Sequence, residues 1–263
     1  MLTSRVRDTA EVFFTRLAEV RRRALLFNFD RTIARFPEAQ GKLGPELTGL
    51  LQGIIDQTET RVVMITQGSA RELNSQLELD PGPEIWGYCA IERLLPHGDL
   101  EVGPLDARGA RALTAARIAV TSANLGSCLE ENSGALALSW RSLSAPAARH
   151  ARNLAFRAWS PIAALNSLVL TEFDDGMELR LPKHDTRDAV RAIVNELGEN
   201  SVAALLDDDD SSEKGAFCAL RPQDFAVLVC PELQRTSASF WIKSPEELMH
   251  FFSMWLLACR RIQ

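Results

Sequence analysis

Long apolar runs and an excess of positive charge are both missing from this sequence. No stretch approaches the run of about 18 apolar residues that a membrane-spanning helix needs, and residues 1–23 are charged and amphipathic rather than signal-like. The formal net charge of −6 gives no electrostatic reason to expect a nucleic acid or an anionic membrane as a partner. We therefore expect a cytoplasmic protein that binds neither nucleic acid nor membranes.

Closely spaced cysteines and histidines are missing as well. The five cysteines are odd in number, scattered and without a CxxC pair, which is typical of buried thiols in a reducing compartment. The four histidines fall in expected loops or on helix faces and have no metal-ligand spacing. The sequence therefore indicates no disulfide framework, and we assign the histidines no role.

What the sequence does contain is an alternation of buried-strand and helix patterns. Hydrophobic residues make up 46% of the 263 residues and charged residues 24%, which is usual for a globular protein with a proper core. The apolar runs predict strands at 24–29, 61–66, 85–95, 201–206 and 225–229. Helical spacing predicts helices at 5–20, 44–59, 70–79, 185–197, 213–220 and 245–259. This alternation predicts an α/β fold with a doubly wound parallel sheet.

The pattern changes in the middle of the chain. An Ala-rich helix at 107–124, an alternating strand at 134–143 and a helix at 148–166 precede a hairpin that turns at Asp174–Gly176. A helix-and-hairpin unit of this size is typical of an inserted cap. We therefore predict a core of residues 1–104 and 183–263, with an α/β cap of residues 105–182 between its two parts.

Two acidic strand ends, NFDRT and LLDDDDSSE, carry the main chemical signal. Phosphoryl transfer by an aspartate needs a nucleophilic carboxylate and a second carboxylate two residues on, and the period of a strand puts both on one side. It also needs further acids to hold Mg²⁺, which prefers oxygen ligands. In open α/β sheets such groups gather at the carboxyl ends of strands, where we expect Asp30, Thr66 and Glu92.

These motifs resemble those of the haloacid dehalogenase (HAD) phosphatase superfamily and, more closely, its trehalose-6-phosphate phosphatase family. The family's Asp-x-Asp-Gly-Thr falls on Asn28–Thr32, and its strand into Ser/Thr-Gly-Arg falls on Ile65-Thr66 and the residues after it. Its Lys-Gly-x-Ala-Val falls on Thr186–Val190, and its Gly-Asp-Asp-x-Thr-Asp-Glu-x-x-Phe on Asp208–Phe217. The resemblance implies a HAD-like core with an inserted cap.

The resemblance also implies a mechanism and a set of site residues. In an active relative a Mg²⁺-assisted aspartate nucleophile takes the phosphoryl group, and a second aspartate acts as acid and base. The catalytic positions fall on Asn28, Asp30, Thr66 and Thr186, and the metal positions on Asn28, Asp30, Asp209 and Asp210. The sugar-contacting positions of the cap fall on Glu130, Asn132, Arg141 and Glu178.

The departures from the family pattern fall where the chemistry is. Asn28 stands at the nucleophile position, and its neutral amide cannot form an acyl-phosphate. Arg31 replaces a glycine that suits a tight turn, and Thr186 replaces the lysine that would neutralise the phosphate. Ser69 and Asn132 replace an arginine and a lysine. A single change at position 28 would also fit a phosphatase altered to trap its substrate, but the joint changes favour a degenerate site.

We therefore predict a trehalose-6-phosphate phosphatase homologue that is catalytically impaired or inactive. It would bind a sugar phosphate such as trehalose-6-phosphate, or a protein partner of trehalose metabolism, with Mg²⁺ possible at a weakened site. The alternative is an active Mg²⁺-dependent phosphatase of weak or altered activity that uses Asp30, Asp209 and Asp210. A third hypothesis is a structural interaction protein whose cleft binds nothing.

Four features have a purely structural alternative. The acids at 207–210 form either a solvated turn or a weak cation site. Asp30 either caps its loop through backbone N–H groups or transfers protons. Thr66 and Ser212 either form turns or bind phosphate, and Arg141 lies either at the ligand or on the surface.

Overall fold

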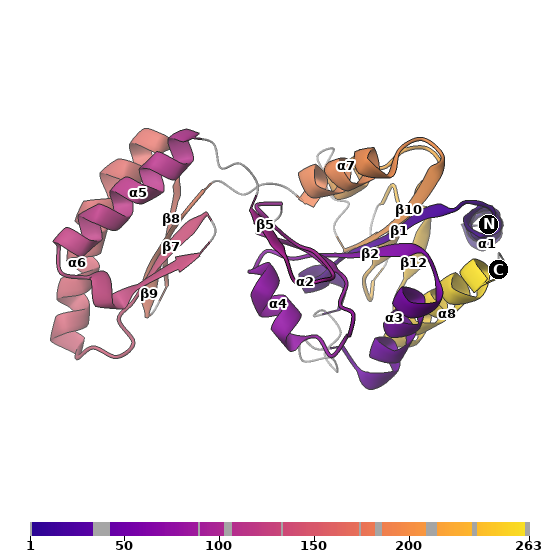
Figure 1. Cartoon of the computed structure of the whole chain (residues 1–263), viewed down its shortest axis with the longest axis horizontal. Coiled ribbons are helices and arrows are strands. Elements are labelled where there is room, and N and C mark those ends of the chain that lie inside the picture. Colours follow the sequence, from indigo (N-terminus) through magenta and orange to yellow (C-terminus); the bar gives the residue numbers. More distant parts are fainter. Residues whose placement is uncertain are drawn as a thin grey trace. The chain divides into compact units, whose positions relative to one another are not determined.

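The computed structural model describes residues 2–33, 43–88, 90–102, 107–132, 134–173, 175–181, 186–208, 215–232 and 236–260, with side chains from Ala10 on in the first helix. Two compact units make up the chain: residues 1–101 with 184–263, and residues 102–183 (Figure 1). The sequence-based junctions lie at 104/105 and 182/183, and the role of the second unit as a cap stays a prediction. No helix of the described residues is long and apolar enough to cross a membrane.

The first unit is built on an eight-stranded sheet in the order β12-β11-β10-β1-β2-β3-β4-β5. Its strands are β1 (Arg22–Asn28), β2 (Thr60–Ile65), β3 (Glu84–Gly87), β4 (Glu92–Leu94), β5 (Leu100–Val102), β10 (Ser201–Asp207), β11 (Phe225–Val229) and β12 (Phe240–Ile242). All pairs from β12 to β3 are parallel, and β4 runs antiparallel to β3. The predicted α/β fold with a doubly wound parallel sheet is confirmed.

Helices cover both faces of this sheet, as Figure 1 shows. They are α1 (Leu2–Glu19), α2 (Phe29–Thr32), α3 (Pro45–Gln57), α4 (Ala70–Gln76), α7 (Thr186–Leu197), α8 (Pro245–Arg260) and the 3₁₀ helix η3 (Ala216–Ala219). Alternate residues of β1 point to opposite faces, so Leu25 and Phe27 pack with α1, α3 and α8, while Ala24 and Leu26 pack with α7. Because both faces of the sheet are buried, the sequences of the central strands are continuous apolar runs.

Two predicted elements of this unit are wrong. The strand expected at 85–95 is two antiparallel strands, because the chain turns after Gly87 with Tyr88 and Ala90 at positive φ of 47° and 101°. Gly87 is required there, since a Cβ atom would lie 2.5 Å from the backbone nitrogen of Ala70. The helix expected at 213–220 is only the 3₁₀ turn η3 in its described part, and 211–214 lie outside the described residues.

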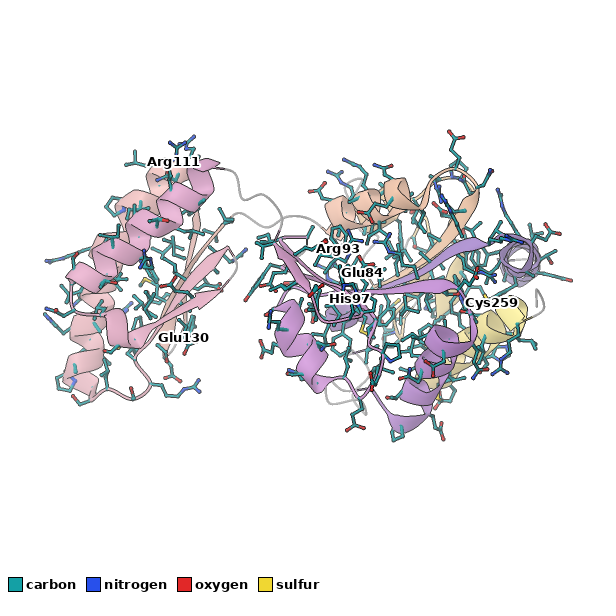
Figure 2. The ribbon with its side chains drawn as sticks, in the orientation of Figure 1. Glu84, Arg93, His97, Arg111, Glu130 and Cys259 are labelled. Atoms are coloured by element: carbon teal, nitrogen blue, oxygen red, sulfur yellow. The ribbon has the colours of Figure 1, made fainter. Side chains whose placement is uncertain are left out.

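The second unit is a four-stranded antiparallel sheet in the order β6-β7-β9-β8, with helices on one face (Figure 1). Its elements are α5 (Ala107–Ser122), η2 (Gly126–Cys128), β6 (Leu129–Asn132), β7 (Ala135–Ser139), α6 (Ala145–Asn166), β8 (Val169–Phe173) and β9 (Gly176–Arg180). Leu136, Leu138, Met177 and Leu179 are buried on the helix-covered face, together with Trp159 of α6. Figure 2 shows the side chains that fill the space between helices and sheet in each unit.

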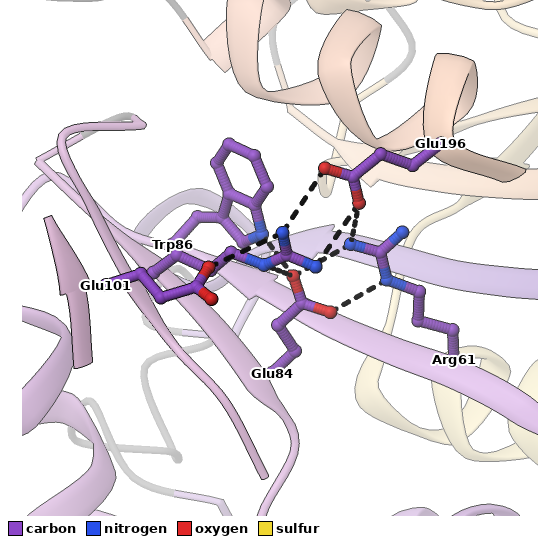
Figure 3. A network of polar contacts seen from close by, with 6 residues as sticks. Arg61, Glu84, Trp86, Glu101 and Glu196 are labelled. Atoms are coloured by element: carbon purple, nitrogen blue, oxygen red, sulfur yellow. Dashed lines mark hydrogen bonds and ion pairs between the residues drawn. The ribbon is translucent and has the colours of Figure 1, made fainter. Parts of the chain in front are cut away.

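An ion-pair network joins one end of the first unit's sheet to α7 (Figure 3). The buried carboxylate of Glu84 accepts hydrogen bonds from Arg61 at 2.7 and 2.8 Å, from Arg93 at 2.7 Å and from the Trp86 ring nitrogen at 2.7 Å. Both guanidinium groups also pair with Glu196 of α7. The network therefore holds β2, β3, β4 and α7 together.

Candidate functional site

The first predicted motif lies where β1 ends and α2 begins. Strand β1 ends at Asn28, which is 1% exposed, and the chain turns at once into α2. The Thr32 hydroxyl donates a hydrogen bond of 2.6 Å to the Asn28 carbonyl oxygen, which ties the short helix to the strand end. The apolar run predicted a strand to residue 29, but Phe29 already belongs to the helix.

Asp30 connects this turn to the end of β2. The Thr66 hydroxyl oxygen lies 3.1 and 3.0 Å from the two carboxylate oxygens of Asp30, and the Gln67 backbone N–H donates at 2.7 Å. The Thr66 hydroxyl in turn accepts a bond of 3.0 Å from the Gly68 N–H. The structure thus brings Asp30 and Thr66 together, and it gives Asp30 the backbone partner that a loop-capping role requires. Proton transfer by Asp30 stays a prediction.

Asp207 is the residue of the site that sequence reasoning missed. It ends β10, which pairs with β1 through the neighbouring residues Leu206 and Phe27, and it is buried. Burial raises the pKa of Asp207 to about 7, although the Asp208 N–H, the Arg31 charge and a hydrogen bond from Asn28 favour the ionised form. The Asp208 N–H donates to it at 2.8 Å. Four acids in a row gave no sign of which one would face inward.

Arg31 reaches the same acidic strand end from the other side of the turn. Its Nη1 atom lies 3.6 Å from Oδ1 of Asp208, and the Arg31 side chain is 37% exposed against 6% for Asp208. Asn28, Arg31, Asp207 and Asp208 therefore lie together at the carboxyl ends of β1 and β10, where an open α/β sheet gathers its working groups.

The second predicted motif is a helix start. Ser69 precedes α4, and its hydroxyl lies 3.3 Å from the Glu92 carboxylate, which also accepts a bond of 2.8 Å from the Ala70 N–H. A carboxylate at the first turn of a helix satisfies backbone donors that have no partner within the helix. Glu92 is thus at the expected sheet edge, as the first residue of β4, and it stabilises local structure there.

Four further predicted positions are less defined. Thr186 is the first residue of α7 and is half-buried, and α7 packs against β1. Asp209, Asp210 and Ser212 lie outside the described residues. Among the residues that are described, no three His, Cys, Asp or Glu side chains are grouped so that they could hold a metal ion.

The predicted sugar-contacting residues lie on the strands of the second unit. Glu130 and Glu178 both pair with Ala137 across β6, β7 and β9, so their side chains share the sheet face opposite the helices. Glu178 forms an ion pair of 3.5 Å with Arg180. The backbone of Asn132 pairs with Ala135 on β7, and its side chain lies outside the described part of the chain.

Arg141 does not join this group. It follows β7 at the strand end beside the β8–β9 turn, where its side chain is 81% exposed and pairs with Asp175 at 3.0 Å. Glu130 and Glu178 instead lie on either side of Ala137, a residue within β7 that precedes Arg141 in the chain. The geometry thus places Arg141 on the surface at this strand end.

No model of a protein family matches the sequence, and no curated protein matches it significantly. Solved structures do match. Trehalose-6-phosphate phosphatase of Aspergillus fumigatus is 17% identical and aligns over 95% of this chain and 98% of its own, with a TM-score of 0.59.

Two further structures agree with it. A trehalose-6-phosphate phosphatase related protein is 17% identical over 89% of this chain and 97% of its own, with a TM-score of 0.56. The HAD-superfamily phosphatase BT1666 of Bacteroides thetaiotaomicron is 12% identical over 89% of this chain and 94% of its own, with a TM-score of 0.51. The chain has the fold of the HAD phosphatases.

The predicted resemblance is therefore confirmed at the level of fold, with trehalose-6-phosphate phosphatases among the structural neighbours of this chain. Sequence identities this low carry the fold alone. What the chain does with a HAD phosphatase fold depends on its own residues, and at the end of β1 these include Asn28, an amide where the family motif has an aspartate.

Proposed function

We propose that this protein is a trehalose-6-phosphate phosphatase homologue without effective phosphatase activity, which works by binding. Its ligand would be a sugar phosphate such as trehalose-6-phosphate, or its partner would be a protein of trehalose metabolism. The observation that supports this most strongly is Asn28, a buried amide at the end of β1 whose hydrogen bond goes to Asp207.

The chemistry of the site supports the loss of phosphoryl transfer. An amide nitrogen is neutral and non-basic, so Asn28 offers no nucleophile for a phosphoryl group. Asp30, the surviving acid of the first motif, accepts hydrogen bonds from Thr66 and Gln67. Thr186 supplies no ammonium group where the family motif has a lysine. Removal of a nucleophile alone normally lowers the rate by several orders of magnitude.

The second unit supports the binding half of the proposal. Glu130, Glu178 and Arg180 offer charged acceptors and donors on the sheet face opposite the described helices α5 and α6. Carboxylates and guanidinium groups bind the hydroxyls and phosphates of sugar phosphates through charge-assisted hydrogen bonds. This face is therefore the proposed place of contact with the ligand.

The first test is turnover. The purified protein, with Mg²⁺ and either trehalose-6-phosphate or an aryl phosphate, should show no turnover near the usual enzymatic range of about 1 to 1,000 s⁻¹. Turnover in that range, abolished by Asp30→Ala, would instead establish the active phosphatase as the function. Asp30→Ala is informative because Asp30 is the acid that the active mechanism would still need.

The second test is binding, measured by calorimetry with trehalose-6-phosphate. Glu130→Gln should weaken binding about tenfold, the effect expected for the loss of one charge-assisted hydrogen bond. Glu131→Gln is the matched control, because Glu131 is the next residue of the same strand and pairs with Leu136 on the other face. Equal loss in both variants would refute the proposed face. No binding by the wild type would leave the protein partner as the function to pursue.

A further inference from the structure

The position of Arg31 bears on whether this site needs a metal ion. That question goes beyond the proposed function and does not depend on it. The guanidinium group of Arg31 lies 3.6 Å from the Asp208 carboxylate, at the strand end where the family resemblance places a metal ion. Arg31 belongs to α2, one residue after Asp30, and the family motif has a glycine at this position. A positive charge is thus built into the chain beside the acids.

The described residues do not fit Mg²⁺, which takes six oxygen ligands in near-octahedral geometry. Asp30 accepts bonds from Thr66 and Gln67, Asp207 accepts one from the Asp208 N–H, and Asp208 pairs with Arg31. Within the described part of the chain, no three acidic, His or Cys side chains are grouped to hold a metal. Asp30, Asp207 and Asp208, the acids of these strand ends that the structure describes, are therefore each engaged with a donor of the protein itself.

Among the described residues, Asn28 offers the site a buried oxygen, Oδ1, that is not hydrogen-bonded. A neutral amide oxygen is a single ligand and a weaker one than a carboxylate for a hard divalent cation. It would nevertheless be available to a metal ion, together with Asp208, if the guanidinium group were removed.

We propose that the Arg31 guanidinium takes the place of the divalent cation in this protein, so that its phosphatase-like site is metal-independent. A guanidinium group keeps its charge at all accessible pH values and pairs with carboxylates through several N–H donors. Its attachment to α2 fixes it at the acidic strand end without a binding equilibrium. Arg31 then supplies the positive charge that a bound metal ion would otherwise supply at this site.

The test compares metal binding by the wild type, Arg31→Gly and Arg31→Lys. Mn²⁺ replaces Mg²⁺ as the probe, because it accepts the same oxygen ligands and its free concentration can be counted by electron paramagnetic resonance. We expect Arg31→Gly to bind one Mn²⁺ at least about tenfold more tightly than the wild type. In about 5 mM MgCl₂, the melting temperature of Arg31→Gly should rise by about 3 °C or more against NaCl of equal ionic strength, and that of the wild type should not.

Arg31→Lys is the control, because it keeps a positive charge and should bind Mn²⁺ no better than the wild type. If Arg31→Gly does not fold by circular dichroism, Arg31→Gln removes the charge while keeping side-chain bulk, and the same shifts are expected. The proposal is overturned if the wild type binds Mn²⁺ as tightly as the uncharged variants, or if Arg31→Lys gains the site too. None of these readouts requires trehalose-6-phosphate or phosphatase turnover, so they stand apart from the tests of function.

Discussion

Replacement of Glu84 by glutamine should destabilise the first unit far more than any surface charge change nearby. The Glu84 side chain is 5% exposed and accepts four hydrogen bonds, three of them from the guanidinium groups of Arg61 and Arg93 (Figure 3). Glutamine keeps the shape but removes the charge, and its amide group turns a donor towards cations. Arg61 and Arg93 would then lose the buried negative charge that they share, and one of the two acceptor oxygens.

The magnitude follows from burial. Removal of one partner of a buried ion pair costs about 3–5 kcal/mol, while exposed pairs contribute about 0–1 kcal/mol. Arg61 and Arg93 are 22% and 27% exposed, so water and Glu196 recover part of the loss. We therefore expect Glu84→Gln to lower the free energy of unfolding by about 2–3 kcal/mol in urea denaturation at neutral pH.

A matched control and a pH series sharpen this test. Glu101→Gln removes a carboxylate that is 57% exposed and lies 3.7 Å from the same Arg93, and it should cost less than about 1 kcal/mol. Burial raises the pKa of Glu84, but the hydrogen bonds and charge of Arg61 outweigh it, so the pKa lies below the ordinary value of 4.5. The stabilisation is then complete above pH 4.5 and is lost as the pH falls further. Equal stability of Glu84→Gln and Glu101→Gln would refute this reasoning.

Two predictions concern the candidate site. The pKa of Asp207 in the folded protein is about 7 against an ordinary 3.8, so the folded state holds an extra proton and loses stability as the pH rises between these values. Asp207→Asn should remove that loss, so its free energy of unfolding in urea denaturation should exceed that of the wild type by up to about 4 kcal/mol at pH 8. A difference between the two proteins that stays constant from pH 4 to 8 would contradict this prediction. Asn28→Asp should restore no turnover of trehalose-6-phosphate with Mg²⁺, because Thr186 and Arg31 remain. Recovery of turnover would show that the residue at position 28 alone accounts for the loss of activity.

The fold was predicted well because the apolar pattern that marks each strand or helix lies within a short stretch of the sequence. The apolar runs placed β1, β2, β10 and β11 within about two residues of their observed ends. At the start of α8, the Glu247 N–H lies 3.4 Å from the Ser244 hydroxyl, a contact typical of a capped helix start. The turn between β3 and β4 was missed because Tyr88 and Ala90 adopt positive φ without being glycines.

The site was harder to predict because its contacts join distant segments. Asp30 and Thr66 are 36 residues apart, and Arg31 and Asp208 lie in different halves of the sequence, so no short sequence window contains either pair. Arg141 was a candidate because it retains the arginine of the family motif, and the structure places its exposed side chain beside Asp175, just past the end of β7. Motif alignment identifies which residues are near a site along the chain, and only register decides which way they face.

The altered residues at the ends of β1 and β10 make sense as one electrostatic set. Asp207 faces inward beside position 28, so an aspartate at that position would bring two carboxylates together in a buried place. Like charges so close raise each other's pKa, and one of the pair would stay protonated. An asparagine avoids this conflict and donates a hydrogen bond to Asp207, while Arg31 offsets the charge of Asp208. Restoring the nucleophile alone would therefore recreate the repulsion without the divalent cation that relieves it.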